Sequence, residues 1–312
     1  MSFPILGLHH VTATVDDAQA DLDFAADALG MRLVKKTVNF DNRGVYHFYY
    51  GDERGTPGTL WTTFPYHVLG IPPGSKGAGQ VTVTSFSVPA GSLQAWKKRL
   101  RERGFTVTDA PPRFGEESIV VTDPSGLAIE LVGSKDDARK PWVGQTDEQS
   151  AVRGIHSVTL NVADPKPTLA FMREWFGVEL SDEMEGRRRV SVGGSGPGKT
   201  VDILTSPDGV RARNGVGTVH HVAFAIPESR LQLELRDALV QRGINVTPVM
   251  DRSYFQSIYF REPGGVLFEV ATVAPGFTVD EKLEDLGKGL KLPPWEEHNR
   301  PDIEAALPPV TY

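Results

Sequence analysis

The sequence contains no cysteine among its 312 residues, which excludes disulfide bonds and thiolate metal sites. No apolar run approaches the roughly 20 residues that span a membrane. The first residues, MSFPILGLHH, lack the basic region and apolar stretch of a secretory signal. We therefore expect a cytoplasmic protein with no membrane partner. The formal net charge of −7 and the lack of a concentrated basic stripe argue against a nucleic-acid partner.

Four segments have helical patterning, and each follows a strand-like stretch and ends at a glycine suited to a left-handed helix terminus. The predicted helices cover residues 16–29, 92–103, 165–176 and 228–242, with Asp16, Ser92, Asp164 and Ser229 as N-terminal caps. Further strand-like stretches follow each glycine. The unit is therefore a strand, a helix and three strands, and it recurs about every 65 to 75 residues, which makes four modules.

These modules predict an α+β fold in which four βαβββ units form two open, cupped, mixed sheets. One unit cannot bury both faces of its sheet, so the modules must pair. We assign modules one and two to residues 1–135 and modules three and four to residues 152–274, with a linker at 134–151. Residues 275–312 form a C-terminal tail, which we expect to pack on the surface, with a lid over a cavity as the alternative.

Two histidine doublets open equivalent strands, LHHVTATV from Leu8 and VHHVAFAI from Val219. Because side chains alternate along a strand, His10 and His221 share faces with small or polar residues, which leave room for a cavity. His9 and His220 are predicted to point to the apolar face, toward the helices. This pattern makes His10 and His221 the candidate metal ligands, although hydrogen bonding at a sheet edge would also explain one doublet alone.

The repeat alignment supplies a candidate carboxylate ligand. The last strands of modules two and four place Glu130 and Glu269 at the matching position, whereas modules one and three offer no glutamate there. Asp202 of module three lies one or two positions away.

The ligand count favours one pairing of the modules. Val83 and Ser157 occupy the positions that correspond to His10 and His221 in modules two and three, so pairing in sequence order would leave only two ligands per site. Pairing module one with module four instead brings His10, His221 and Glu269 together. We therefore predict that modules one and four share a metal site.

Two histidines and one carboxylate with open positions form the ligand set of non-heme Fe(II) sites that use dioxygen, and Mn(II) can replace the iron. Such a positive centre can bind an anionic phenolate beside dioxygen. Glu130 has no histidine partners in this alignment. We interpret it as structural, with an arginine as its expected partner, and as the chief alternative ligand.

The repeat, with LHHVTATV, VHHVAFAI and YFREPGGVLFEVA, resembles the vicinal oxygen chelate superfamily of glyoxalases, extradiol dioxygenases and bleomycin-resistance proteins. Within it, KKTVNFDNRGVYHFYYGDERGTPGTLWTTFP and VTPVMDRSYFQSIYFREPGGVLFE resemble the hydroquinone-type ring-cleaving dioxygenases. The resemblance extends from about Leu6 to the C-terminal LPPWEEH. It implies Fe(II) held by His10, His221 and Glu269. It also implies supporting roles for further residues, namely His9, Thr12, His220, Arg252 and Tyr259.

The first functional hypothesis is a dioxygenase that opens the ring of an aromatic diol beside a hydroxyl, with the diol and O₂ as its small-molecule partners. A basic histidine would accept the phenol proton, while Tyr259 and Arg252 would stabilise developing oxyanions. Paired-module proteins often form dimers, so a homo-oligomer is compatible with the sequence.

Two alternatives remain open at this point. A glyoxalase-like isomerase or lyase acting on a thiol conjugate would use Zn(II) or Ni(II) and a fourth protein ligand near Thr62 or Leu204. A metal-free protein that binds an aromatic toxin would need an aromatic groove. Its candidate lining residues are Phe48, Trp61, Phe224 and Phe255, although scattered aromatic residues more often belong to a core.

Overall fold

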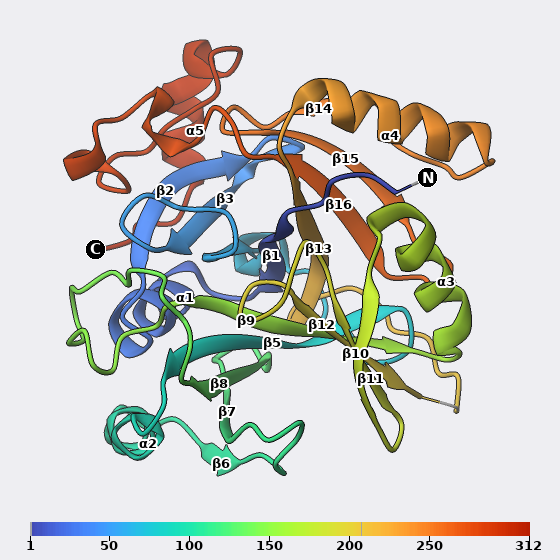
Figure 1. The fold of residues 1–312 in the computed structure, drawn as a ribbon. Coiled ribbons are helices and arrows are strands. Elements are labelled where there is room, and N and C mark those ends of the chain that lie inside the picture. The colour runs from blue at the N-terminus through green and yellow to red at the C-terminus, as the bar shows by residue number, and fades with distance from the viewer. Residues whose placement is uncertain (1, 207) are drawn as a thin grey trace.

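The computed structural model describes residues 2–206 and 208–312, and its order of elements confirms four βαβββ modules (Figure 1). Module one contains β1 (Gly7–Val15), α1 (Ala18–Leu22) with the π-helix η1 (Asp23–Ala28), β2 (Arg32–Asn39), β3 (Asn42–Gly51) and β4 (Leu60–Pro65), followed by the short helix η2 (His67–Leu69). Module two contains β5 (Gln80–Pro89), α2 (Leu93–Glu102), β6 (Val107–Asp109), β7 (Ser118–Thr122) and β8 (Ala128–Ser134). Module three contains β9 (Gly154–Val162), α3 (Pro165–Phe176), β10 (Glu179–Met184), β11 (Arg187–Ser191) and β12 (Thr200–Thr205). Module four contains β13 (Thr218–Ile226), α4 (Ser229–Gln241), β14 (Met250–Asp251), β15 (Gln256–Arg261) and β16 (Leu267–Thr272).

The modules pair as the ligand count predicted. Modules one and four form an eight-stranded mixed sheet in the order β14-β15-β16-β13-β1-β4-β3-β2, and modules three and two form the other, β10-β11-β12-β9-β5-β8-β7-β6. In Figure 1 the blue strands of module one lie beside the orange and red strands of module four. The central strands β1 and β13 are antiparallel, and each is parallel to the last strand of its own module. The two ends of the chain therefore meet in one sheet.

The apolar faces of the central strands pack into one core that the two sheets and their helices share. Phe224 of β13 is fully buried, and its ring centroid lies 4.9 Å from that of Phe176 in α3. Burying such a side chain contributes roughly 1.5–3 kcal/mol. The helix of module three thus packs on strands of module four, and this face of the central strands is filled by core side chains.

Local capping chemistry sets the helix starts, with two differences from the predicted caps. Asp164 caps α3 by accepting a backbone N–H two residues further on. In module one the cap is Asp17 rather than Asp16, because the Asp17 carboxylate accepts a backbone N–H of the first turn. α4 follows Glu228 rather than Ser229. The predicted terminal glycines all have positive φ: Gly30, Gly104, Gly177 and Gly243. None of the helices in the described ranges is long and apolar enough to cross a membrane.

The C-terminal tail packs on module one and also contacts aromatic side chains of modules one and four. It contains four short helices: η3 (Phe277–Val279), η4 (Leu283–Asp285), η5 (Glu297–Asn299) and α5 (Arg300–Ala306). The fully buried Lys35 of β2 donates hydrogen bonds to Asp280, at 2.6 Å, and to Glu281. Phe277 stacks on Tyr254 with ring centroids 4.9 Å apart. These contacts agree with the predicted packing tail.

Candidate metal centre

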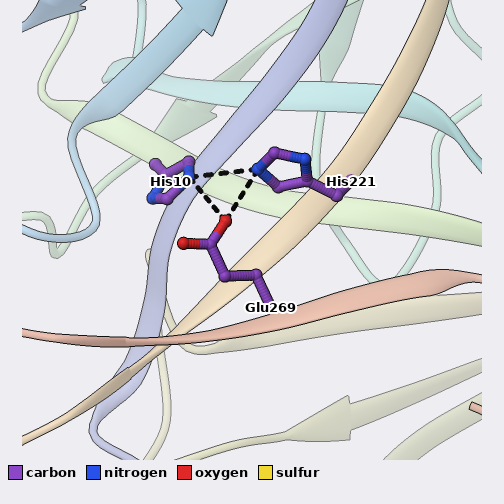
Figure 2. Close-up of side chains that lie close together, drawn as sticks. All are labelled: His10, His221 and Glu269. Carbon is purple, nitrogen blue, oxygen red and sulfur yellow. Dashed lines mark hydrogen bonds and ion pairs between the residues drawn. The ribbon is translucent and has the colours of Figure 1, made fainter. Parts of the chain in front are cut away.

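His10, His221 and Glu269 converge in the sheet of modules one and four (Figure 2). They come from β1, β13 and β16. The two Nε2 atoms are 3.2 Å apart, and Glu269 Oε2 lies 3.1 Å from His10 Nε2 and 2.8 Å from His221 Nε2. All three side chains are buried. The structure therefore brings together the three residues that the sequence singled out as ligands.

The donor atoms fit a divalent cation. Glu269 Oε2 is buried and has no partner with hydrogen-bond geometry among the described residues. Leaving a buried carboxylate oxygen unpartnered is costly, so a cation is the expected partner. Metal–ligand bonds of about 2.0–2.2 Å at right angles separate donor atoms by about 3 Å, as the three observed separations do. Two imidazoles and one carboxylate also match a non-heme Fe(II) site chemically.

The protonation states of Glu269 and His221 suit metal binding as well. Burial alone would raise the pKa of Glu269, but the adjacent imidazoles of His10 and His221 hold it well below its ordinary value. Burial lowers the pKa of His221, although Glu269 opposes this effect. Ionised carboxylate and neutral imidazole are the forms that ligate metals. Ser257 donates its hydroxyl to Oε1 of Glu269, which orients the carboxylate.

Both histidine doublets lie at β-bulges, and the bulges redirect one histidine of each pair. The pairing of β1 with β13 skips His9 on one strand and His220 on the other. Such an extra residue breaks the alternation of side chains. His9 Nδ1 consequently lies 2.9 Å from His10 Nδ1, and His220 Nδ1 lies 2.8 Å from His221 Nδ1.

The predicted direction of these two histidines, toward the helices, is therefore wrong. His220 lines the same cavity as His221, and the His9 ring packs against Phe255 with centroids 4.9 Å apart. Burial and the adjacent histidine of each doublet lower the pKa of His9 and of His220 to about 3. Both rings are therefore neutral at neutral pH.

A cavity of about 460 Å³ opens beside His10 and His221, within the size range of small-molecule sites. Its wall is formed by side chains from modules one and four and is mostly aromatic or apolar. Besides His10, His220 and His221, the lining residues are Asn39, Phe40, Asp41, His47, Tyr49, Phe64, Tyr66, Thr247, Met250, Arg252, Phe255, Tyr259 and Leu267.

Tyr259 and Arg252, both predicted site residues, lie together in this wall. Tyr259 is paired with Glu269 across β15 and β16, and its ring centroid is 5.6 Å from that of His221. Arg252 Nε donates to the Tyr259 hydroxyl at 3.1 Å. Burial and the nearby Glu269 raise the pKa of Tyr259, so its hydroxyl stays protonated. The pair thus presents one cation and one hydroxyl close to His221 and Glu269.

Thr12, the remaining predicted site residue, is fully buried and does not line the cavity. Its hydroxyl lies 2.7 Å from that of Thr62, which lies 3.0 Å from His47 Nε2. Thr12 therefore reaches the cavity only through a chain of hydrogen bonds that ends at His47.

The sequence reasoning missed His47 and Asp41 as cavity residues. Burial lowers the pKa of His47 well below its ordinary value, which keeps this ring neutral. The only signal was the alternation in VYHFYY, which places His47 and Tyr49 on one face of β3. Asp41 lies in the turn between β2 and β3, and no periodicity marks a turn residue as part of a site.

The alternative ligands Glu130 and Asp202 lie in the other sheet, where arginines neutralise them. Arg113 binds both oxygens of Glu130, as the predicted arginine pairing required. Asp202 accepts hydrogen bonds from Arg187 at 3.0 Å and Arg189 at 2.7 Å. Arginine side chains thus neutralise the carboxylates in the sheet of modules two and three. Within the described ranges, this sheet has no cluster of three metal-ligating side chains.

Most of the aromatic residues considered for a binding groove belong instead to the core. Phe48, Trp61 and Phe224 are buried within it, and Phe255 alone of the four lines the cavity. The aromatic wall of the cavity consists mainly of other residues, contributed by β3, β4 and the adjoining turns.

The sequence matches the Glyoxalase/Bleomycin resistance protein/Dioxygenase superfamily over residues 7–131 and 154–270. It is 38% identical over 298 residues to the chlorohydroquinone/hydroquinone 1,2-dioxygenase of Sphingobium indicum, covering 92% of this chain and 91% of that protein. MhqO of Bacillus subtilis, provisionally named a ring-cleaving dioxygenase, is 40% identical over 311 residues, which cover 99% of this chain and 98% of MhqO. The crystal structure of a Bacillus subtilis protein, provisionally named a dioxygenase, aligns with a TM-score of 0.94 at 40% identity over 99% of both chains.

Proposed function

Because this chain belongs to the Glyoxalase/Bleomycin resistance protein/Dioxygenase superfamily, we propose that it is an Fe(II)-dependent ring-cleaving dioxygenase. It inserts both atoms of O₂ into a hydroquinone or catechol, next to a ring hydroxyl, as extradiol enzymes do. The names of its full-length relatives support ring cleavage. The observation that carries the proposal is the convergence of His10, His221 and Glu269 beside an aromatic-lined cavity.

His10 and His221 would hold the metal through Nε2, and Glu269 would hold it through Oε2. This ligand set would leave the metal able to bind small molecules as well. When bound, Fe(II) supplies a positive centre that favours an ionised ring hydroxyl and passes electron density from the ring to dioxygen. Mn(II), which accepts the same ligands, is the alternative metal.

His9 and His220 orient the two ligand imidazoles. A metal-bound Nε2 carries no proton, so the proton of each neutral ligand ring is on Nδ1. His10 then donates from Nδ1 to His9 Nδ1, and His221 donates in the same way to His220. The Nε2 of His220 consequently keeps its proton, and this histidine offers a hydrogen-bond donor to an oxyanion in the cavity.

The remaining groups handle the proton and the charge of the diol. His47 is bonded through Nε2 to Thr62, while the described residues provide no partner for its Nδ1, which is left to accept a hydroxyl proton. The Thr12 hydroxyl is hydrogen-bonded to that of Thr62 and so holds Thr62 in position. Arg252 and Tyr259 stabilise negative charge that develops on the opening ring.

A glyoxalase-like isomerase is supported less well. The metal-ligand cluster found in the described residues has three members, and Thr62, near the expected fourth ligand, is hydrogen-bonded to Thr12. A metal-free binding protein would have no need for three converging ligand side chains.

The test is oxygen uptake after anaerobic loading with Fe(II), followed with an electrode across hydroquinones and catechols. Ring-opened product formed under ¹⁸O₂ should carry two labelled atoms. His10→Ala should lose both bound iron and oxygen uptake, whereas Ser157→Ala, at the equivalent position in module three, should retain both. The proposal fails if neither diol class consumes oxygen and His10→Ala leaves the bound iron unchanged.

A further inference from the structure

One ion pair joins the two halves of the shared sheet across the cavity. Asp41 lies in the turn between β2 and β3 of module one, and Arg252 lies between β14 and β15 of module four. Asp41 Oδ2 accepts a hydrogen bond from Arg252 Nη2 at 3.0 Å. The Asp41 side chain is 62% exposed and that of Arg252 is 15% exposed, so the carboxylate occupies the outer end of the pair.

Arg252 is the one lysine or arginine among the described residues that line this cavity. Two of its five N–H groups are engaged, because Nη2 donates to Asp41 and Nε donates to the Tyr259 hydroxyl. The cavity wall also includes the apolar side chains of Phe40, Phe64 and Leu267. A second negative charge on a bound ring would meet an arginine whose charge Asp41 already balances, and it would face the Asp41 carboxylate.

We propose that Asp41 is a specificity-determining residue that restricts the cavity to aromatic diols without an anionic ring substituent. Its carboxylate neutralises Arg252 at the mouth of the cavity and repels a ring carboxylate, while small apolar substituents fit the wall. This inference rests on the proposed function, because it names the class of diol that the same cavity accepts. Without the Asp41 charge, Arg252 becomes a ready partner for a ring carboxylate.

Equilibrium binding tests this inference without turnover. Dissociation constants for hydroquinone and for 2,5-dihydroxybenzoate, the same diol with a carboxylate, are measured by calorimetry under argon with the metal-loaded protein. The wild type should bind hydroquinone at least tenfold more tightly. Asp41→Asn should reduce that preference at least fivefold by strengthening binding of the carboxylated ring, and Asp41→Glu should retain the preference.

Asp109→Asn is the matched control, because Asp109 is also an exposed carboxylate in an ion pair, with Lys97 in module two. It should leave the preference unchanged. The inference is overturned if the wild type binds both rings equally, if Asp41→Asn leaves the preference unchanged, or if neither ring binds. A shifted preference without oxygen uptake would instead refute only the dioxygenase function, and oxygen uptake with an unshifted preference would refute only the role of Asp41.

Discussion

The buried carboxyl of Asp21 in α1 should make the stability of the protein fall as the pH rises toward neutrality. Burial raises its pKa from the ordinary 3.8 to about 7, even though hydrogen bonds from Thr63 and Tyr50 oppose that rise. The folded state therefore holds a proton that the unfolded chain loses near pH 4. The contribution of the Asp21 carboxyl to the free energy of unfolding is fully present below about pH 4 and is lost as the pH approaches 7.

The magnitude follows from the two pKa values. The difference is about three pH units, and each unit corresponds to about 1.4 kcal/mol, so the loss between pH 4 and pH 8 is at most about 4 kcal/mol. Asp21→Asn keeps an oxygen that accepts the hydrogen bonds of Tyr50 and Thr63 but has no proton to lose. The stability of the variant relative to the wild type should therefore increase steadily from pH 4 to pH 7 and then level off.

The assay is urea denaturation followed by tryptophan fluorescence at intervals from pH 4 to pH 8, with a chelator present so that metal binding does not contribute. Asp23→Asn is the control, because Asp23 is an exposed carboxylate of the same helical segment. Its unfolding free energy should follow that of the wild type. Parallel curves for Asp21→Asn and the wild type over the whole range would refute the reasoning.

Three other substitutions test separate parts of the structure. Lys35→Met removes the buried cation that binds the tail, and it should lower the free energy of unfolding by about 3–5 kcal/mol. An unchanged urea midpoint would show that the tail does not depend on this contact. Arg113→Ala should destabilise by a similar amount but leave bound iron unchanged, because Glu130 lies in the other sheet. Iron loss in the folded variant would contradict this separation. Phe255→Ala removes the ring whose centroid lies 5.3 Å from that of His10, and it should weaken iron binding. It should also lower the free energy of unfolding by about 3–5 kcal/mol. Unaltered iron affinity would show that Phe255 does not hold the ligand in place.

The sequence was sufficient to predict the repeat, the pairing of modules one and four and the convergence of His10, His221 and Glu269. These features follow from residue spacing and from the number of candidate ligands on equivalent strands. Small local distortions of the backbone change neither of these. The Glu130–Arg113 pairing was predictable for the same reason, since a buried carboxylate without histidine neighbours needs a cation.

The sequence did not reveal the direction of His9 and His220, because a β-bulge depends on the register between two strands distant in the chain. Turn residues such as Asp41 have no periodicity, and their place in the cavity depends on how the turn of one module meets another. The cap at Asp17 rather than Asp16 shows the same limit on a smaller scale, since two adjacent aspartates offer equivalent capping chemistry.

The most direct test of the metal centre is the stoichiometry of bound Fe(II). It is measured by elemental mass spectrometry after anaerobic loading and removal of free metal. The wild type should retain one iron per chain. Glu269→Ala should retain close to none while its circular dichroism stays that of the folded protein. One iron per chain in folded Glu269→Ala would contradict the assignment of His10, His221 and Glu269 as the ligands of the site.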